Sequence, residues 1–193
     1  MHKEICPKKL GKHRNGIIVG RFQPFHLEHL RFVAAAAKKV DHLWIGITRP
    51  FGNHIPEIGG ARATDDANPL PYWLRFKCVE STLMHDAKIP RETFSILPAP
   101  LVPGIIEQLV PKGTIFLTTF VEEWSLFKEK LFINAGFKVI KLDLGNKKIS
   151  GTMIRERIRK KDENWKDFIP SSIREQYATL IAAYVRRSKI DLF

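Results

Sequence analysis

The chain has 193 residues, 44% of them hydrophobic, and its formal net charge at pH 7 is +12. This length fits one domain with a buried core, and such a charge favours anionic partners: nucleotides, nucleic acid or an acidic membrane surface. We expect neither a membrane span nor a signal peptide, because the apolar runs are far shorter than roughly 20 residues and Met1–Asn15 is polar and basic.

The chain begins with a segment that we interpret as an N-terminal basic arm, residues 1–15. It contains Cys6, and Cys78 is the second of two cysteines. Two isolated cysteines make neither a disulfide framework nor a metal site with cysteine spacing. They favour a reduced, cytoplasmic compartment.

Short apolar runs then alternate with amphipathic patterns. The strand-like runs are Gly16–Gly20, His42–Thr48, Phe94–Leu97, Thr114–Thr118 and Phe137–Leu142. The helical patterns are Leu27–Val40, Pro71–His85 and Val121–Ala135. This alternation predicts βαβ units with right-handed crossovers. The fold class is therefore α/β, a Rossmann-like, doubly wound parallel sheet of five strands, in a domain over residues 16–163.

Two segments lie outside this alternation. Pro50–Leu70 is a long loop with several glycines, and long loops in compact domains are often functional. Residues 164–193 are expected to form a C-terminal helix packed on the domain. Ser172 and Glu175 have the spacing of a capping box, and apolar residues follow at helical intervals.

The first motif, Gly20-Arg21-Phe22-Gln23-Pro24-Phe25-His26-Leu27-Glu28-His29, joins a predicted strand to a predicted helix. His26 and His29 are three residues apart and share one face of the first helical turn. Ligands of open α/β sheets bind at the carboxyl ends of the strands, where helix N-termini favour phosphate. The motif therefore favours a phosphate ligand.

The second motif, Ile149-Ser150-Gly151-Thr152-Met153-Ile154-Arg155, lies at another such corner. Ser150 and Thr152 bring hydroxyls and backbone N–H groups to the start of a helix, where Ser150 is also a suitable N-cap. Arg155 lies one turn further on. Together, the two corners predict a polyphosphate site.

The pair of motifs resembles the HxGH nucleotidyltransferase superfamily, and most of all its archaeal-type nicotinamide-nucleotide adenylyltransferases. The resemblance implies a reaction in which an acceptor phosphate attacks the α-phosphate of ATP and pyrophosphate leaves. Because that acceptor is already an anion, alignment and charge neutralisation suffice for catalysis. The implied catalytic residues are His26, His29 and Arg155. The implied nucleotide-binding residues are Gly20, Arg21, Phe22, Ser150, Thr152 and Arg155.

A further segment, Asn68–Arg75, resembles the family's Asn-Pro helix start. It makes Arg75 a candidate for the acceptor phosphate, with a structural salt bridge as the alternative. Thr48 and Arg49 end the second strand at the same sheet edge and are candidates by position. Phe120 and Trp124 are candidates for stacking on an acceptor ring, with core packing as the alternative.

The chain departs from the family at two places. Glu28 stands where the family has the glycine between its two histidines, so its carboxylate either points away from the phosphates or alters the base pocket. After the fourth strand, Thr118–Trp124 replaces a small polar turn on the acceptor side. These departures leave other small phosphates open as acceptors, while the resemblance favours nicotinamide mononucleotide.

The predicted partners are ATP and a small phosphate-bearing acceptor, without a membrane partner; a homo-oligomer stays open. Mg²⁺ is the expected cofactor, bound mainly through the triphosphate, and we predict no protein-ligated metal site. The first alternative is a cytidylyltransferase acting on a small phosphate or phosphonate. A non-catalytic nucleotide sensor or an RNA-binding module is the alternative of another class, although basic stripes with interleaved aromatics are missing from the sequence.

Overall fold

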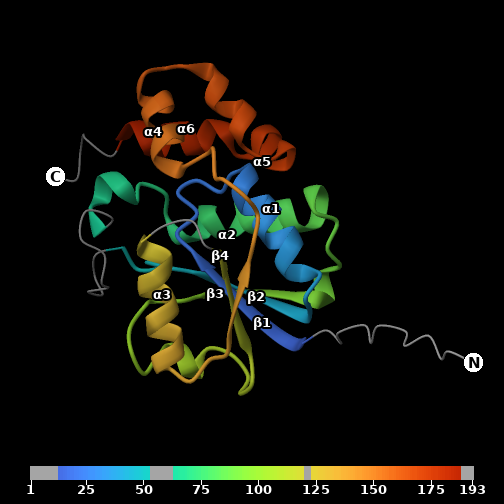
Figure 1. Cartoon of the computed structure of the whole chain (residues 1–193). Helices are drawn as coiled ribbons and strands as arrows, with labels where there is room; N and C mark the ends of the chain where they lie inside the picture. The colour runs from blue at the N-terminus through green and yellow to red at the C-terminus, as the bar shows by residue number, and fades with distance from the viewer. Residues whose placement is uncertain (1–12, 53–62, 120–122, 188–193) are drawn as a thin grey trace, which may run out of the picture.

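A computed structural model describes residues 13–52, 63–119 and 123–187 of the chain (Figure 1). Its centre is a five-stranded sheet in the order β3-β2-β1-β4-β5, with every adjacent pair parallel. The strands are β1 (His13–Gly20), β2 (Val40–Ile47), β3 (Phe94–Pro98), β4 (Ile115–Thr119) and β5 (Val139–Leu142). The predicted five-stranded, doubly wound, Rossmann-like α/β fold is confirmed.

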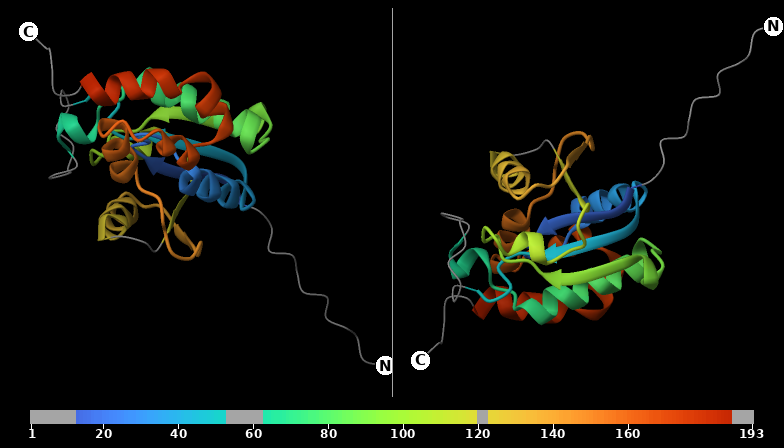
Figure 2. Two further views of the ribbon diagram at one scale, coloured as in Figure 1. Left: turned by 90° about the horizontal axis from the view of Figure 1, so that it is seen from above. Right: turned by 90° about the horizontal axis from the view of Figure 1, so that it is seen from below.

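Helices cover both faces of this sheet. The α-helices are α1 (Leu27–Ala37), α2 (Tyr72–Ser81), α3 (Glu123–Asn134), α4 (Gly151–Arg159), α5 (Ser171–Gln176) and α6 (Ala178–Arg187). Shorter helical turns are η2 (Asp65–Ala67), η3 (Thr82–Asp86), η4 (Arg91–Thr93), η5 (Ile106–Gln108) and η6 (Glu163–Phe168). Figures 1 and 2 show α1, α2 and the C-terminal helices on one face and α3 on the other.

The sheet divides the core into two parts. Ile17 and Ile18 are adjacent on β1, both are 0% exposed, and they pack in different hydrophobic clusters. Successive side chains of a strand point to opposite faces, so a strand that is covered on both sides reads as a continuous apolar run. The run Ile17-Ile18-Val19 has that pattern because β1 is the central strand.

The order in which strands are added to the sheet reverses between β1 and β4, although all strands are parallel. β2 and β3 extend the sheet on one side of β1, whereas β4 and β5 extend it on the other. The carboxyl ends of β1 and β4 therefore flank a topological switch point, where open α/β sheets bind ligands.

Helix ends differ from the sequence predictions in several places. The predicted helix Leu27–Val40 ends at Ala37, and Val40 begins β2 opposite His13. β1 starts at His13, so residues 13–15 of the expected arm belong to the strand, while residues 1–12 lie outside the described residues. The predicted helix Pro71–His85 is α2 followed by the π-helical turn η3. The hydrophobic pattern of the sequence does not mark these ends, because a buried valine such as Val40 is compatible with either a helix or a strand.

The C-terminal region is more divided than the sequence predicted. Three elements, η6, α5 and α6, replace the single expected helix, with a break at Tyr177. Ser172 lies inside α5 rather than at its N-cap, so the predicted capping box is wrong. The Ser171 N–H and hydroxyl and the Ser172 hydroxyl donate to the Asp86 carboxylate instead, which caps α5 from η3. The proposed domain boundary at residue 164 stays a prediction.

Within the described residues, the helices are too short or too polar to cross a membrane.

Candidate nucleotide site

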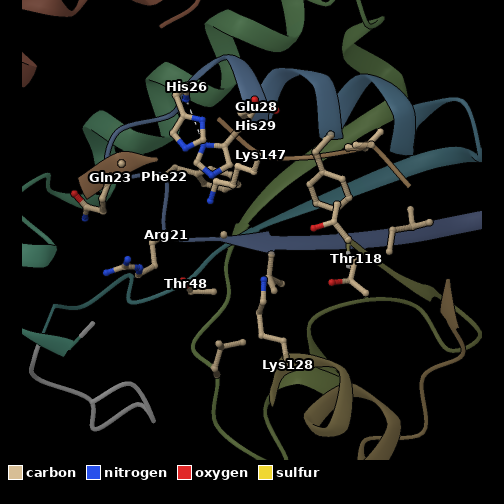
Figure 3. A pocket seen from close by; sticks show the side chains of 18 of the residues that line it. Arg21, Phe22, Gln23, His26, Glu28, His29, Thr48, Thr118, Lys128 and Lys147 are labelled. Atoms are coloured by element: carbon tan, nitrogen blue, oxygen red, sulfur yellow. Dashed lines mark hydrogen bonds between the residues drawn. The ribbon is translucent and has the colours of Figure 1, made fainter. Parts of the chain in front are cut away.

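A cavity of about 180 Å³ opens at the carboxyl ends of β1 and β4 (Figure 3). Residues of β1, β4, α1, α3 and α4 line it, together with residues of the segments that follow β1, β2, β3 and β5. They are Val19, Gly20, Arg21, Phe22, Gln23, His26, Glu28, His29, Phe32, Thr48, Leu101, Leu117, Thr118, Thr119, Lys128, Leu144, Gly145, Lys147, Gly151 and Arg155. Both sequence motifs thus meet at one cavity, as predicted.

The first corner is built around Phe22. A Cβ on Gly20 would lie 2.7 Å from the Phe22 ring, so glycine is needed for the strand to pass under this ring. Phe22 has a φ of 52° and is 3% exposed. Its ring packs edge-on against His29, with 5.0 Å between the centroids. Phe22, expected to bind nucleotide, belongs mainly to the core and supports His29 at the cavity wall.

The two histidines are stacked on the first turn of α1. Their ring centroids are 3.7 Å apart, and the His26 N–H donates to His29 Nδ1 at 3.3 Å. This bond uses Nδ1 of His29 as an acceptor, so in the neutral ring the proton resides on Nε2. Burial lowers the pKa of His29 well below its usual value, and the charges of His26, Lys147, Lys128 and Arg21 lower it further. His29 is therefore neutral near pH 7 and has an Nε2–H donor.

Other residues of the first corner join it to the loop before α2. Arg21 donates to the Ala67 carbonyl and to Asn68 Oδ1, both at 3.4 Å. The buried Gln23 side chain exchanges two hydrogen bonds with the Leu70 backbone, at 3.0 and 2.9 Å. Arg21 still lines the cavity, whereas the Gln23 amide is committed to shaping the turn.

The second corner begins with Ser150, the N-cap of α4, whose Oγ accepts from the Met153 N–H at 3.2 Å. Next to it, a Cβ on Gly151 would lie 2.7 Å from the Gln23 carbonyl oxygen. Only glycine permits the two corners to approach this closely. Thr152 is exposed at the start of α4. The helix N-terminus is thus available to an anion.

Arg155 joins the two corners. Its Nη1 donates to the Gln23 carbonyl at 2.8 Å, and its Nη2 donates to Thr152 Oγ1 at 3.2 Å. The side chain lines the cavity but is 4% exposed, and burial lowers the pKa of its guanidinium. Arginine remains charged near neutrality all the same. The structure therefore places Arg155 as a charged brace at the cavity edge.

Arg75 has a similar bracing position beneath the strand ends. It is 2% exposed and donates to three carbonyl oxygens, those of Arg21 at 3.0 Å, Thr48 at 2.7 Å and Arg49 at 2.8 Å. The alternative to phosphate binding that the sequence offered was a salt bridge. The three partners named above are backbone carbonyls, because α2 passes directly under the ends of β1 and β2. The salt bridge stays a prediction.

The remaining candidates for acceptor binding do not lie together at the cavity in the part of the chain that the structure describes. Thr48 is 3% exposed and lines the cavity. Arg49 is 6% exposed, has a φ of 50°, and donates to the Ala63 carbonyl at 3.3 Å. Phe120 lies outside the described residues, and Trp124 belongs to α3 with its side chain outside the description. Stacking by Phe120 or Trp124 thus stays a prediction.

Several cavity residues were not among the predicted site residues, and Lys128, Lys147 and Thr118 are polar examples. Lys147 lies in the segment between β5 and α4. Lys128 lies on α3, and the spacing of α3 gave no sign that one lysine faces the cavity. Thr118 ends β4 at the switch point, and its position at a strand end was the available signal.

Glu28 also lines the cavity, but its carboxylate is turned to the segment between β5 and α4. It pairs with Arg31 at 2.9 Å and accepts from the Lys148 N–H at 3.2 Å. Arg31 in turn donates to the Leu144 carbonyl at 2.9 Å. Glu28 therefore holds that segment against α1, and its charge is partly neutralised by Arg31.

Among the residues that the structure describes, no three histidine, cysteine or carboxylate side chains converge in a way that would hold a metal ion. The charged side chains around the cavity are mostly cationic, which suits an anionic ligand.

Comparisons with known proteins agree with this geometry. The family model described as cytidylyltransferase-like matches residues 17–157. The chain is 28% identical over 162 residues to the phosphonoformate cytidylyltransferase of Streptomyces viridochromogenes, covering 82% of this chain and 87% of that protein. It is 30% identical over 172 residues to the nicotinamide-nucleotide adenylyltransferase of Archaeoglobus fulgidus, covering 81% and 86%.

A solved structure shares the fold. It is a bifunctional NMN adenylyltransferase/ADP ribose pyrophosphatase of Francisella tularensis, complexed with AMP and a manganese ion. The TM-score is 0.62 and the sequence identity is 16% over 90% of this chain. The match covers 52% of that longer protein, so the present chain spans about half its length.

Proposed function

Since the chain belongs to the cytidylyltransferase-like family of nucleotidyltransferases, we propose that it transfers AMP from ATP to a small phosphate-bearing acceptor. An oxygen of the acceptor phosphate attacks the α-phosphorus, and a new O–P bond forms. The bond from that phosphorus to the bridging β-phosphate oxygen breaks, and pyrophosphate leaves.

One observation carries this proposal: the first turns of α1 and α4 meet at the cavity, held together by the 2.8 Å bond from Arg155 to the Gln23 carbonyl. Two helix N-termini, with His26, His29 and Lys147 beside them, form a strongly anion-binding wall. Such a wall suits a triphosphate and stabilises the charge that develops as its α-phosphate is transferred.

His29 has a defined role in this mechanism. Its Nδ1 accepts from the His26 N–H, so its Nε2–H is the donor that faces a phosphate oxygen. A bound triphosphate raises the pKa of His29, because an adjacent anion favours the protonated ring, whereas protonation at Nδ1 would remove the acceptor of the His26 N–H. His29 thus donates a hydrogen bond in either state, and no side chain has to remove a proton from the acceptor phosphate.

Two observations bear on the base and the acceptor. Similarity to several archaeal nicotinamide-nucleotide adenylyltransferases supports ATP and nicotinamide mononucleotide. Similarity to a phosphonoformate cytidylyltransferase, together with Glu28 in place of the family glycine, supports the second candidate, cytidylyl transfer to a small phosphonate. We favour adenylyl transfer because the Gly20–Pro24 and Ile149–Thr152 sequences resemble the adenylylating branch.

Mg²⁺ is the proposed cofactor, carried mainly by the triphosphate; the Francisella tularensis protein of the same fold was crystallised with AMP and a manganese ion. When bound, it neutralises part of the phosphate charge. Cys78 is buried as a free thiol, in keeping with the proposed cytoplasmic location.

The test is a pyrophosphate-release screen that crosses ATP, CTP, GTP and UTP with a panel of small phosphates and phosphonates. Adenylyl transfer predicts release with ATP and nicotinamide mononucleotide, and the dinucleotide appears by mass spectrometry. Release with CTP and a phosphonate would favour the second candidate. A protein that binds nucleotide but releases no pyrophosphate with any pair would contradict both.

A further inference from the structure

Three arginines from different elements converge on a short segment before α2, residues 63–68, which contains η2. They are Arg21 from the corner after β1, Arg49 after β2 and Arg159 from α4. Each of them donates to a backbone carbonyl of the segment, that of Ala67, Ala63 or Asp66. The segment therefore joins the corner after β1 to α4 by a second route, in addition to the direct contact between the two motifs.

The contact between Asp66 and Arg159 is the shortest of these. Arg159 Nη2 lies 2.7 Å from Asp66 Oδ1, and it also donates to the Asp66 carbonyl at 3.0 Å. One nitrogen thus holds both the side chain and the backbone of Asp66 against α4. The Asp66 side chain is 50% exposed, so this ion pair adds little to the stability of the fold. Its main effect is on the position of η2.

The charge of Asp66 also acts on the second motif. Arg155 and Arg159 are one turn apart on α4, and like charges at this spacing repel each other. Burial and the charge of Arg159 lower the pKa of the Arg155 guanidinium, whereas the charge of Asp66 raises it. Asp66 therefore offsets part of the repulsion between the two arginines.

The turn η2 connects Asp66 to Arg21. Arg21 Nη1 donates to the Ala67 carbonyl and to Asn68 Oδ1, which belong to the two residues after Asp66. Side-chain hydrogen bonds make the turn compact: the Ala67 N–H donates to Thr64 Oγ1 at 3.3 Å, and Asn68 Nδ2 donates to the Thr64 carbonyl at 2.8 Å. A shift of Asp66 therefore moves both of these acceptors of Arg21.

Arg21 in turn lines the cavity, where it is a candidate for binding the triphosphate. Figure 3 shows its side chain at the end of β1, below the two histidines. Its two bonds to η2 are 3.4 Å long, compared with a usual distance of about 2.9–3.0 Å. These bonds orient the guanidinium, while a phosphate oxygen is the stronger acceptor because it is charged.

We propose that Asp66 is a positioning residue of the nucleotide site. Its contact with Arg159 fixes η2 against α4, and η2 holds the Arg21 guanidinium at the cavity before the triphosphate binds. Asp66 itself is not among the residues that line the cavity. This inference rests on the proposed nucleotidyl transfer and adds to it a residue outside both motifs.

The sign of the effect on nucleotide binding tests this role. Asp66 is an anion near a site for an anion, so its charge alone predicts that its removal strengthens triphosphate binding. Loss of positioning predicts weaker binding instead. The two effects have opposite signs, and the affinity for nucleotide therefore distinguishes them.

The experiment is a double-mutant cycle between Asp66 and Arg21. Wild type is compared with Asp66→Ala, Arg21→Met and the double variant. Asp41→Ala is the matched control, because Asp41 is an exposed aspartate at the amino end of β2. Titration calorimetry gives the Kd of ATP without an acceptor. Pyrophosphate release gives the KM of ATP and the KM of the acceptor, and CTP replaces ATP if the screen described above selects it.

Asp66→Ala is expected to raise the Kd and the KM of ATP about three- to tenfold, as for loss of a charged contact. The KM of the acceptor should stay within about twofold, and the melting temperature close to that of wild type, because the ion pair is half-exposed. Arg21→Met should raise the Kd of ATP at least as much. Adding Asp66→Ala to Arg21→Met should change it no further, since both act through one side chain. Asp41→Ala should match wild type.

Other outcomes overturn the inference in distinguishable ways. An unchanged or lower Kd in Asp66→Ala would remove the positioning role, and so would additive effects of the two substitutions. An equal rise of both KM values with a large fall in melting temperature would assign Asp66 to stability alone. The Kd values decide the positioning role independently of turnover. Absence of pyrophosphate with every pair of reactants in wild type would therefore overturn the proposed function alone, whereas a wild type that binds neither ATP nor CTP would overturn both.

Discussion

The Arg155 guanidinium donates to the Gln23 carbonyl oxygen at 2.8 Å, across a separation of 132 residues. This bond joins the start of α4 to the corner between β1 and α1, at the point where Gly151 brings the two backbones together. The cavity therefore depends on a contact between the two motifs as well as on each motif separately.

Arg155→Met should lower the free energy of unfolding by about 1–3 kcal/mol, because it removes the charged donor from a buried carbonyl. Urea denaturation measures this change. Lys160→Met is the control, since Lys160 is an exposed cation at the end of the same helix. Turnover should fall as well, since the motifs lose their alignment. Unchanged stability with normal turnover would mean that the corners are held together without Arg155.

His29→Ala should reduce turnover about 10²–10³-fold, the usual cost of removing one preorganised donor from a developing phosphate charge. His26→Ala should have a similar effect, because the His26 ring stacks on His29 and holds it in place. Steady-state pyrophosphate release gives the rates, and circular dichroism checks the fold. His85→Ala, at an exposed histidine, should keep wild-type turnover. Near-normal rates in a folded His29→Ala protein would exclude the catalytic assignment.

The lowered pKa of His29 predicts a pH dependence of stability. In the unfolded chain this histidine titrates near 6.5, whereas burial and nearby cations hold its pKa in the folded protein well below that value. Between the two pKa values the unfolded state binds more protons, so the free energy of unfolding falls as the pH drops below about 6.5.

Thermal unfolding at several pH values measures this slope. His29→Asn keeps an acceptor for the His26 N–H but does not titrate, so its stability should fall less between pH 7 and pH 5 than that of wild type. Identical slopes in the two proteins would show that His29 is not the group responsible.

Arg75→Lys should affect stability more than acceptor binding. Lysine has one ammonium group and cannot reproduce the planar fork that serves the carbonyls of Arg21, Thr48 and Arg49. We expect a loss of about 1–3 kcal/mol in urea denaturation. A higher KM for the acceptor with unchanged stability would instead support the phosphate-binding role that the sequence suggested.

Glu28 lies at the cavity in place of the family glycine, so nucleotide binding by the wild type and by Glu28 variants tests the preference for ATP over CTP. ATP should protect the wild type against thermal unfolding more than CTP does at equal concentration; a ligand at 100 times its Kd adds about 2.7 kcal/mol. Glu28→Gln keeps an acceptor for the Lys148 N–H but removes the negative charge, so it should increase protection by both nucleotides. Glu28→Gly should lower stability in their absence. A clear wild-type preference for CTP would favour cytidylyl transfer.

The sequence by itself determined the fold class and predicted the edge of the sheet at which the cavity lies. Alternating apolar and amphipathic runs predict parallel strands joined by helices, and the carboxyl edge of such a sheet follows from the topology. The positions of His26, His29 and Ser150 could be predicted because each depends on a single strand-to-helix corner. Their roles could be predicted only through the family resemblance.

The tertiary structure decided where the long cationic side chains point. Arg75 and Arg155 resemble phosphate ligands in the sequence, yet they brace carbonyl oxygens that distant segments bring to them. Lys128 resembles an ordinary surface lysine, yet it faces the cavity. The physical reason is that lysine and arginine have long, flexible side chains whose charged groups lie far from the backbone. The partner of each charged group therefore depends on which elements pack nearby. Local periodicity contains no information on those partners, because they come from other parts of the chain.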